Sequence, residues 1–106
     1  MSKYHAMPTY VDNVRFASKA EARRYSELRL LERVGTIADL ELQPRFPLVI
    51  DGHRLCVYVA DFRYLDERGQ TVVEDVKGMP GGTPLFRLKR KLMLAIYGIN
   101  VVEVQA

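Results

Sequence analysis

The chain has 106 residues, a net charge of +3 at pH 7, one cysteine and two histidines. This length fits a single domain, and a hydrophobic content of 48% is enough to bury a core, so a disordered chain is not expected. One cysteine excludes an internal disulfide, and with only two histidines it argues against a structural zinc site. No apolar run approaches the ~18 residues that span a bilayer, so no membrane association is expected.

The first predicted elements are a short hairpin and a helix. Asp12-Asn13 is a tight-turn pair between the strand-like segments 10–11 and 14–16. Ser18 is typical of a helix N-cap, and Glu21 follows at capping-box spacing. Apolar residues then recur at helical intervals as far as Val34, before a glycine. This pattern predicts a helix over about 17–34.

Three strands are predicted next. The first, 40–50, contains Pro44 and Pro47, which suits an edge or irregular strand. Turn signals at 51–52 and 68–69 separate it from strands over 55–64 and 70–77. Because the connections are short, these strands are expected to form an antiparallel meander.

A second helix and a last strand complete the chain. Thr83-Pro84 is typical of an N-cap followed by the first helical residue, and Gly98 ends the helix. Its predicted apolar face consists of Leu85, Leu88, Leu92, Ala95 and Ile96. The strand over 99–104 should run parallel to a neighbour, because a helix connects the two. The predicted fold class is α/β with a mixed sheet, in the order hairpin, helix, meander, helix, strand.

Two acidic residues stand out in the predicted meander. Alternate side chains of a strand share a face, so Asp75 and Lys77 point one way and Glu74 the other. Asp61 ends the apolar segment 57–60, where an acid is costly unless something binds it. If the two strands pair around the turn at 68–69, Asp61 lies beside Asp75. Two close carboxylates repel each other, and a Mg²⁺ ion, which prefers oxygen ligands, relieves that repulsion.

Such a site has a definite chemistry. A bound divalent metal polarises a phosphodiester and helps to ionise water. Lys77 would hold the phosphate or orient the water. Glu21 has two readings, a helix cap at Ser18 or an inward-facing acid that reaches the same metal.

Three sequence elements carry a family resemblance. Ser18-Lys19-Ala20-Glu21, then Tyr58-Val59-Ala60-Asp61-Phe62, then Glu74-Asp75-Val76-Lys77-Gly78, resemble the PD-(D/E)XK nuclease superfamily. The chain looks most like its small phage- and prophage-encoded members, and its motif order is similar to that of phage endonuclease I-type Holliday-junction resolvases. The resemblance covers residues 16–104 and implies one nuclease-like domain, 1–106, with a restriction-endonuclease-like core. One departure is Ala60, where the superfamily name has proline.

The resemblance assigns roles by position. It implies Asp61, Asp75 and Glu21 as metal ligands, the backbone carbonyl of Val76 as another, and Lys77 as the catalytic lysine. It implies Mg²⁺, with Mn²⁺ as a substitute.

The expected function is cleavage of DNA, and specifically a structure-selective or junction-resolving endodeoxyribonuclease. Branched DNA offers symmetric cleavage points, so a homodimer is expected. The alternative is a non-catalytic nucleic-acid-binding or assembly protein that keeps the fold. Met1–His5 lacks the apolar segment of a signal peptide, so a cytoplasmic protein is expected. The resemblance to phage- and prophage-encoded nucleases implies that it acts in a bacterial host.

Basic clusters suggest where nucleic acid would bind, although solvated helix faces would give the same pattern. One lies in the first helix region and the other in the second, at Arg87, Lys89, Arg90 and Lys91. The members of the first are Arg15, Lys19, Arg23 and Arg24. The amide of Gln43 could bind a phosphate or a water ligand, or make a structural hydrogen bond.

Tyr58, Tyr64 and Cys56 are expected in the packing of the strands rather than in catalysis.

Overall fold

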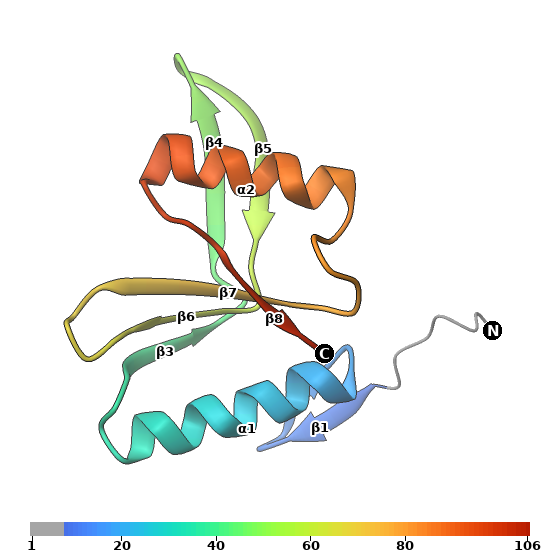
Figure 1. The fold of residues 1–106 in the computed structure, drawn as a ribbon, viewed down its shortest axis with the longest axis vertical. Coiled ribbons are helices and arrows are strands. Elements are labelled where there is room, and N and C mark those ends of the chain that lie inside the picture. The colour runs from blue at the N-terminus through green and yellow to red at the C-terminus, as the bar shows by residue number, and fades with distance from the viewer. Residues whose placement is uncertain (1–7) are drawn as a thin grey trace.

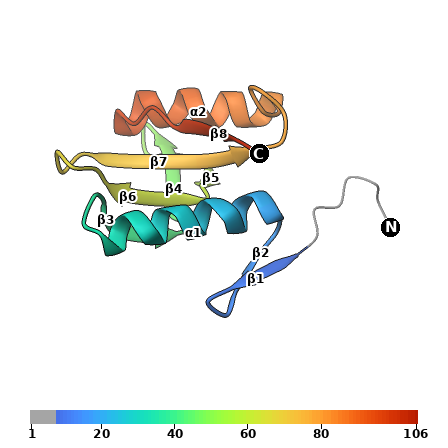
Figure 2. The ribbon, with the colours of Figure 1, turned by 60° about the horizontal axis from the view of Figure 1, so that its bottom comes forward.

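A central sheet lies between two helices in the computed structural model, which describes residues 8–106 (Figures 1 and 2). Helix α1 (Lys19–Arg33) packs below the sheet in Figure 2, and helix α2 (Pro84–Tyr97) packs above it. The predicted α/β class with a mixed sheet and two helices is therefore confirmed. Among the described residues, no helix is long and apolar enough to cross a membrane. The segment 1–5, on which the expected location depends, lies outside these residues.

The N-terminal hairpin and α1 form as their local sequence predicts. Strands β1 (Thr9–Val11) and β2 (Val14–Phe16) pair antiparallel around Asp12 and Asn13, whose φ angles are 51° and 63°. These left-handed values suit a turn that matches the twist of the strands. Ser18 caps α1, since its side chain accepts a hydrogen bond from the Glu21 amide at 3.1 Å.

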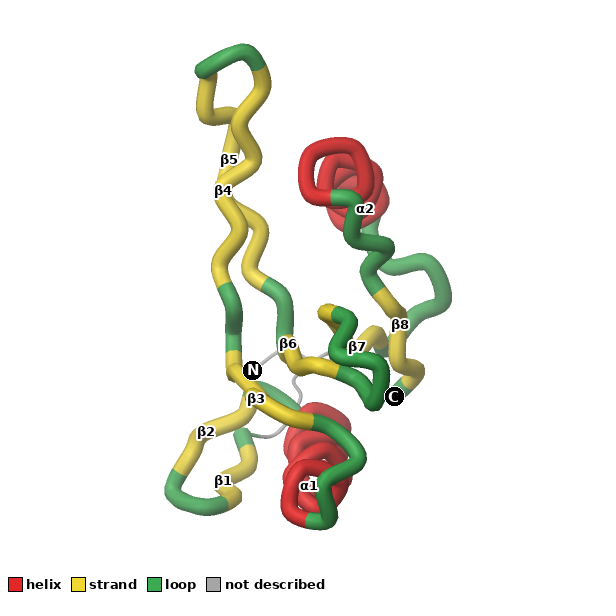
Figure 3. Tube along the Cα trace, turned by 90° about the vertical axis from the view of Figure 1, so that its left-hand side faces the viewer, coloured by secondary structure: helices red, strands yellow, loops and turns green. Residues whose placement is uncertain are grey.

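The first two predicted strands are each divided by a bend, which the sequence analysis did not predict. The segment 40–50 becomes β3 (Ala38–Leu42) and β4 (Arg45–Ile50), and 55–64 becomes β5 (His53–Val59) and β6 (Phe62–Leu65). Strands β4 and β5 form a two-stranded ribbon that turns away from the sheet toward α2 (Figure 3).

Backbone pairing continues through this bend. The Gln43 amide donates to the Asp61 carbonyl at 3.0 Å, and the Ala60 amide donates to the Pro44 carbonyl at 3.1 Å. Gln43 has a φ of 50°, which is unusual for a side chain of its size. Pro44 lacks an N–H, so the sheet cannot continue regularly there.

The central sheet has the strand order β3-β6-β7-β8. Strand β7 (Thr71–Lys77) pairs antiparallel with β6 and parallel with β8 (Val102–Gln105). The meander pairing and the parallel last strand are thus as predicted. Val73 packs in the core beside α2, whereas Glu74 contacts Arg24 of α1. The alternation predicted for β7 is confirmed.

Helix α2 has the predicted ends but buries a different face. Thr83 accepts a hydrogen bond from the Phe86 amide at 3.1 Å, and Gly98 ends the helix with a φ of 69°. Its fully buried residues are Phe86 and Met93. The predicted apolar face was wrong in part, because Leu85, Leu88 and Ala95 are exposed, while Leu92 and Ile96 are half-buried.

Candidate functional site

Asp61 and Asp75 lie side by side where β6 and β7 begin to pair. The Asp61 amide donates to Asp75 Oδ1 at 3.0 Å, and the Val76 amide donates to Asp61 Oδ2 at 2.7 Å. The register explains this contact, because Phe62 is opposite Glu74 and Asp61 is therefore opposite Asp75. The two carboxylates, 14 residues apart in the chain, are brought together as the sequence predicted.

A cleft of about 350 Å³ opens over these two residues. It runs between the end of β7, the first turn of α1 and the start of α2. Its lining residues are Glu21, Val57, Tyr58, Val59, Asp61, Asp75, Val76, Lys77, Phe86 and Lys89. All four predicted catalytic residues, together with Val76, therefore border one space.

Lys77 lies directly beside Asp75. Its Nζ is 3.5 Å from Asp75 Oδ2 and 3.8 Å from the centre of the Phe86 ring. The carboxylate and the face of the ring both attract a cation, so they hold the ammonium group at the cleft.

The site concentrates negative charge. Burial raises the pKa of Asp61 to about 7, and the nearby charges of Asp75 and Glu21 add to the effect, while the Val76 amide opposes it. Burial also raises the pKa of Glu21, and the charge of Asp75 raises it further. A cation bound in the cleft would remove this repulsion.

Glu21 lies both at the start of α1 and at the cleft, although the backbone partner of its carboxyl group is Ala17, whereas the predicted cap partner was Ser18. Its amide donates to the Ser18 side chain, and a hydrogen bond from the Ala17 backbone lowers the pKa of its carboxyl group. Glu21 also lines the cleft, where the charge of Asp75 raises the pKa of its carboxyl group and the charge of Lys77 lowers it. The cap and the cleft are therefore compatible positions for one side chain.

Tyr58 has a contact that the sequence analysis missed. Its hydroxyl donates a hydrogen bond to Asp75 Oδ2. Burial, followed by this bond, raises the pKa of the Tyr58 hydroxyl, which stays protonated as a donor. Tyr58, on β5, thus orients Asp75, on β7. The two residues meet because the paired strands bend where the ribbon joins the central sheet.

The donor set suits a hard cation but is not a complete cage. Within the described range, 8–106, no three His, Cys, Asp or Glu side chains are grouped closely enough to hold a metal ion. Mg²⁺ commonly binds one or two carboxylates together with waters and substrate phosphates. The pair Asp61 and Asp75 fits that requirement, whereas Glu21 would have to move to become a ligand.

The predicted basic clusters are divided by the fold. Lys89 lines the cleft and donates to the Val57 carbonyl at 3.4 Å. Arg87, Arg90 and Lys91 border a different hollow of α2, and Arg90 pairs with Glu103 at 3.3 Å.

In the first cluster, Arg24 turns inward. Its guanidinium makes two hydrogen bonds to the Glu74 carboxylate, at 2.8 and 2.7 Å, so the view of this residue as part of a free basic face was wrong.

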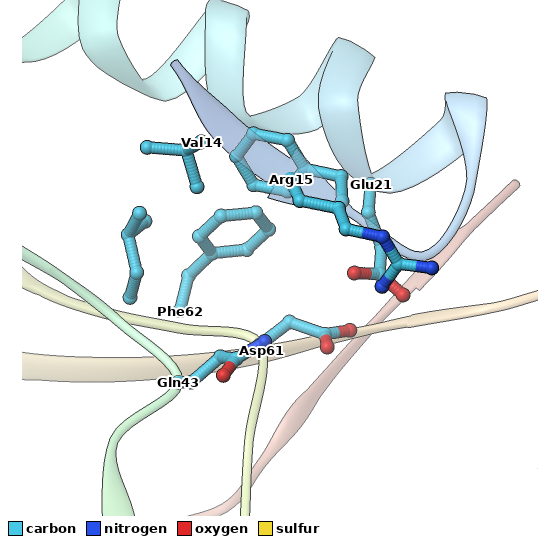
Figure 4. Close-up of a pocket in the computed structure, with 8 residues that line it drawn as sticks. Val14, Arg15, Glu21, Gln43, Asp61 and Phe62 are labelled. Carbon is cyan, nitrogen blue, oxygen red and sulfur yellow. The ribbon is translucent and has the colours of Figure 1, made fainter. Parts of the chain in front are cut away.

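A second, smaller hollow of about 140 Å³ adjoins the cleft. Glu21 and Asp61 line both spaces. The predicted residue Gln43 lies here and not over Lys77, and Arg15 extends toward the Glu21 carboxylate (Figure 4).

Comparison with known proteins gives one match. No curated protein and no solved structure matches the chain. One family model, described as "Protein of unknown function (DUF1064)", matches residues 1–103. Because this match covers almost the whole sequence, the chain belongs to the DUF1064 family.

Proposed function

We propose that this protein is a Mg²⁺-dependent endodeoxyribonuclease that hydrolyses phosphodiester bonds. The observation that carries the proposal is the meeting of Asp61, Asp75 and Lys77 at one cleft, with Lys77 Nζ 3.5 Å from Asp75. Paired carboxylates with an adjacent ammonium suit a reaction in which an anionic phosphate is bound and attacked by water.

Each residue has a distinct role in this reaction. Asp61 and Asp75 would hold the metal ion, for which Mn²⁺ is a plausible substitute. The Val76 carbonyl, and Glu21 after a movement of its side chain, would be further ligands. A divalent ion held there would supply Lewis-acid chemistry, namely polarisation of the phosphodiester and easier ionisation of the attacking water. Lys77 donates hydrogen bonds to a phosphate oxygen or to the attacking water, and Tyr58 keeps Asp75 oriented.

The order of the elements supports a finer assignment. A helix carrying Glu21, the bend between β5 and β6 carrying Asp61, and a strand carrying Asp75 and Lys77 surround the cleft in the order that the PD-(D/E)XK motifs require. On this basis we assign the domain to that superfamily and its core to the restriction-endonuclease-like type. Action as a homodimer on branched DNA in a bacterial cytoplasm is part of the same proposal.

The test is cleavage by the purified full chain. A labelled four-way junction, a linear duplex and a single strand are incubated with Mg²⁺ or with EDTA. We expect Mg²⁺-dependent cleavage, fastest on the junction. Asp75→Asn should slow the single-turnover rate at least about 100-fold, because it removes charge that stabilises the transition state through the metal.

The matched control is Asp51→Asn, which makes the same change at the exposed tip of the β4–β5 ribbon and should cleave normally. If the folded wild-type protein binds DNA but cleaves none of the three substrates, the non-catalytic binding protein is the correct alternative. Equal rates for Asp75→Asn and Asp51→Asn would also overturn the assignment of the site.

A further inference from the structure

We propose that the hollow bordered by Arg15 and Gln43 binds the nucleobase next to the phosphate that is cleaved. This inference rests on the proposed nuclease function and adds a substrate-recognition site to it. The hollow is separate from the cleft that contains Lys77, but both spaces are bordered by Glu21 and Asp61.

The position of the hollow follows from the connectivity of nucleic acid. A phosphodiester has a nucleoside on each side. If the phosphate sits over Asp61, one neighbour extends into the cleft with Lys77 and Lys89. The other neighbour can then extend into the hollow, which is also lined by Glu21 and Asp61 but not by Asp75 or Lys77 (Figure 4).

The walls of the hollow suit a base better than a second phosphate. Four apolar side chains form much of the lining, namely Val14, Phe16, Leu42 and Phe62. Apolar surface is a poor environment for a charged phosphate and a good one for the face of a base. At the rim, Arg15 can donate hydrogen bonds to a base edge, and the amide of Gln43 can both donate and accept them.

The backbone conformation and pairing of Gln43 hold this residue beside the site. Its φ of 50° places a long side chain in the left-handed region, and such strain is often found at binding sites. Pairing with Asp61 through the 3.0 Å hydrogen bond fixes Gln43 next to the catalytic carboxylate. The exposed side chain is therefore held beside the site, although it contributes little to the core.

An unpaired base would enter most readily, because extracting a base from a duplex costs stacking and pairing energy. The hollow would thus favour cleavage beside a junction, a nick or a single-stranded segment over cleavage within a continuous duplex.

The experiment combines abasic DNA with variants of the hollow. After the cleaved bond is mapped, an abasic residue replaces each flanking nucleotide in turn, and kcat/KM is measured. With wild-type protein, we expect roughly a tenfold loss for the abasic residue on one side only. Arg15→Ala and Gln43→Asn should lose a similar factor on intact DNA and then show no further loss on the abasic substrate.

Gln43→Asn is chosen because asparagine tolerates a left-handed backbone. The matched controls, Arg33→Ala and Gln70→Ala, change exposed residues away from the hollow and should keep the full abasic effect. Two outcomes would refute the base site while leaving the nuclease intact. In one, the losses in kcat/KM caused by the substitution and by the abasic residue multiply; in the other, the abasic residue causes equal losses on both sides of the bond. A wild-type protein that cleaves no DNA would overturn the nuclease and the base site together.

Discussion

Asp61 lies in an environment that opposes its own charge. Burial and the neighbouring carboxylates of Asp75 and Glu21 raise its pKa from 3.8 to about 7, even though the Val76 amide donates to it. Functional sites often keep such unfavourable groups at the expense of stability. We therefore expect the Asp61 carboxyl group to lower the free energy of unfolding of the metal-free protein, and to lower it more as the pH rises.

We expect Asp61→Asn to stabilise the metal-free protein at pH 8 and to change it little at pH 4. Near pH 3 and below, Asp61 is largely protonated in both the folded and unfolded states. As the pH rises from about 4 to 7, the unfolded chain releases the proton while the folded protein retains it, so the wild type loses stability. Asparagine avoids this loss, and the gain at pH 8 should be about 2 kcal/mol.

The measurement is urea denaturation in EDTA at both pH values. Asp51→Asn, at the exposed ribbon tip, controls for the loss of one negative charge. An equal effect of Asp61→Asn at pH 4 and pH 8 would show that the carboxyl group is not responsible.

At the scale of elements, a buried ion pair fastens α1 to the sheet. Glu74 is only 1% exposed, and Arg24 binds both of its carboxylate oxygens, while the Tyr64 hydroxyl donates to one of them. The hydrogen bond to Glu74 raises the pKa of Arg24, which stays charged. Glu21 lies one helical turn before Arg24, so this pair also holds Glu21 near the cleft.

We expect Arg24→Met to lower the free energy of unfolding by roughly 3 kcal/mol, because it leaves the Glu74 charge buried without its partner. Arg24→Met combined with Glu74→Gln should recover part of this loss, since the buried charge is then also removed. Chemical denaturation at pH 7 measures both changes.

The neighbouring substitution Arg23→Met is the control. Arg23 is exposed, so its replacement should change stability by no more than about 0.5 kcal/mol. Similar losses for Arg23→Met and Arg24→Met would contradict a specific role for the buried pair.

At the scale of the whole molecule, α2 exposes an apolar stripe. Leu85 is 59% exposed and Leu88 is 54% exposed, and the half-buried Leu92 lies on the same side of the helix. Monomeric proteins seldom expose a continuous apolar patch without a binding role. In the homodimer that is part of the proposed function, this stripe would contact a second copy of the chain.

We expect Leu88→Glu to shift the protein from dimer to monomer in sedimentation velocity experiments, because it places a charge in the stripe. Leu94→Glu is the matched control, since Leu94 is 53% exposed but borders the hollow of Arg87 and Arg90. Dissociation by both variants, or a wild type that is monomeric at all concentrations tested, would exclude the stripe as the dimer interface.

Features that depend on neighbouring residues could be predicted from the sequence. Ser18 and Thr83 start the two helices because their side chains accept backbone hydrogen bonds within the same turn. Strand alternation separated Asp75 and Lys77 from Glu74 without knowledge of the fold. Pairing around one short turn then placed Asp61 opposite Asp75.

Only the tertiary structure decided the features that depend on distant residues. The buried partner of Arg24 is Glu74, 50 residues away, and Tyr58 reaches Asp75 because the paired strands bend at Gln43 and Asp61. The buried face of α2 depends on where the sheet and ribbon lie, so apolar periodicity alone misassigned Leu85 and Leu88. Local sequence thus determined the helices, the strand alternation and the three central catalytic candidates, whereas long-range packing determined the bends in the strands, the residues that support the site and the second hollow.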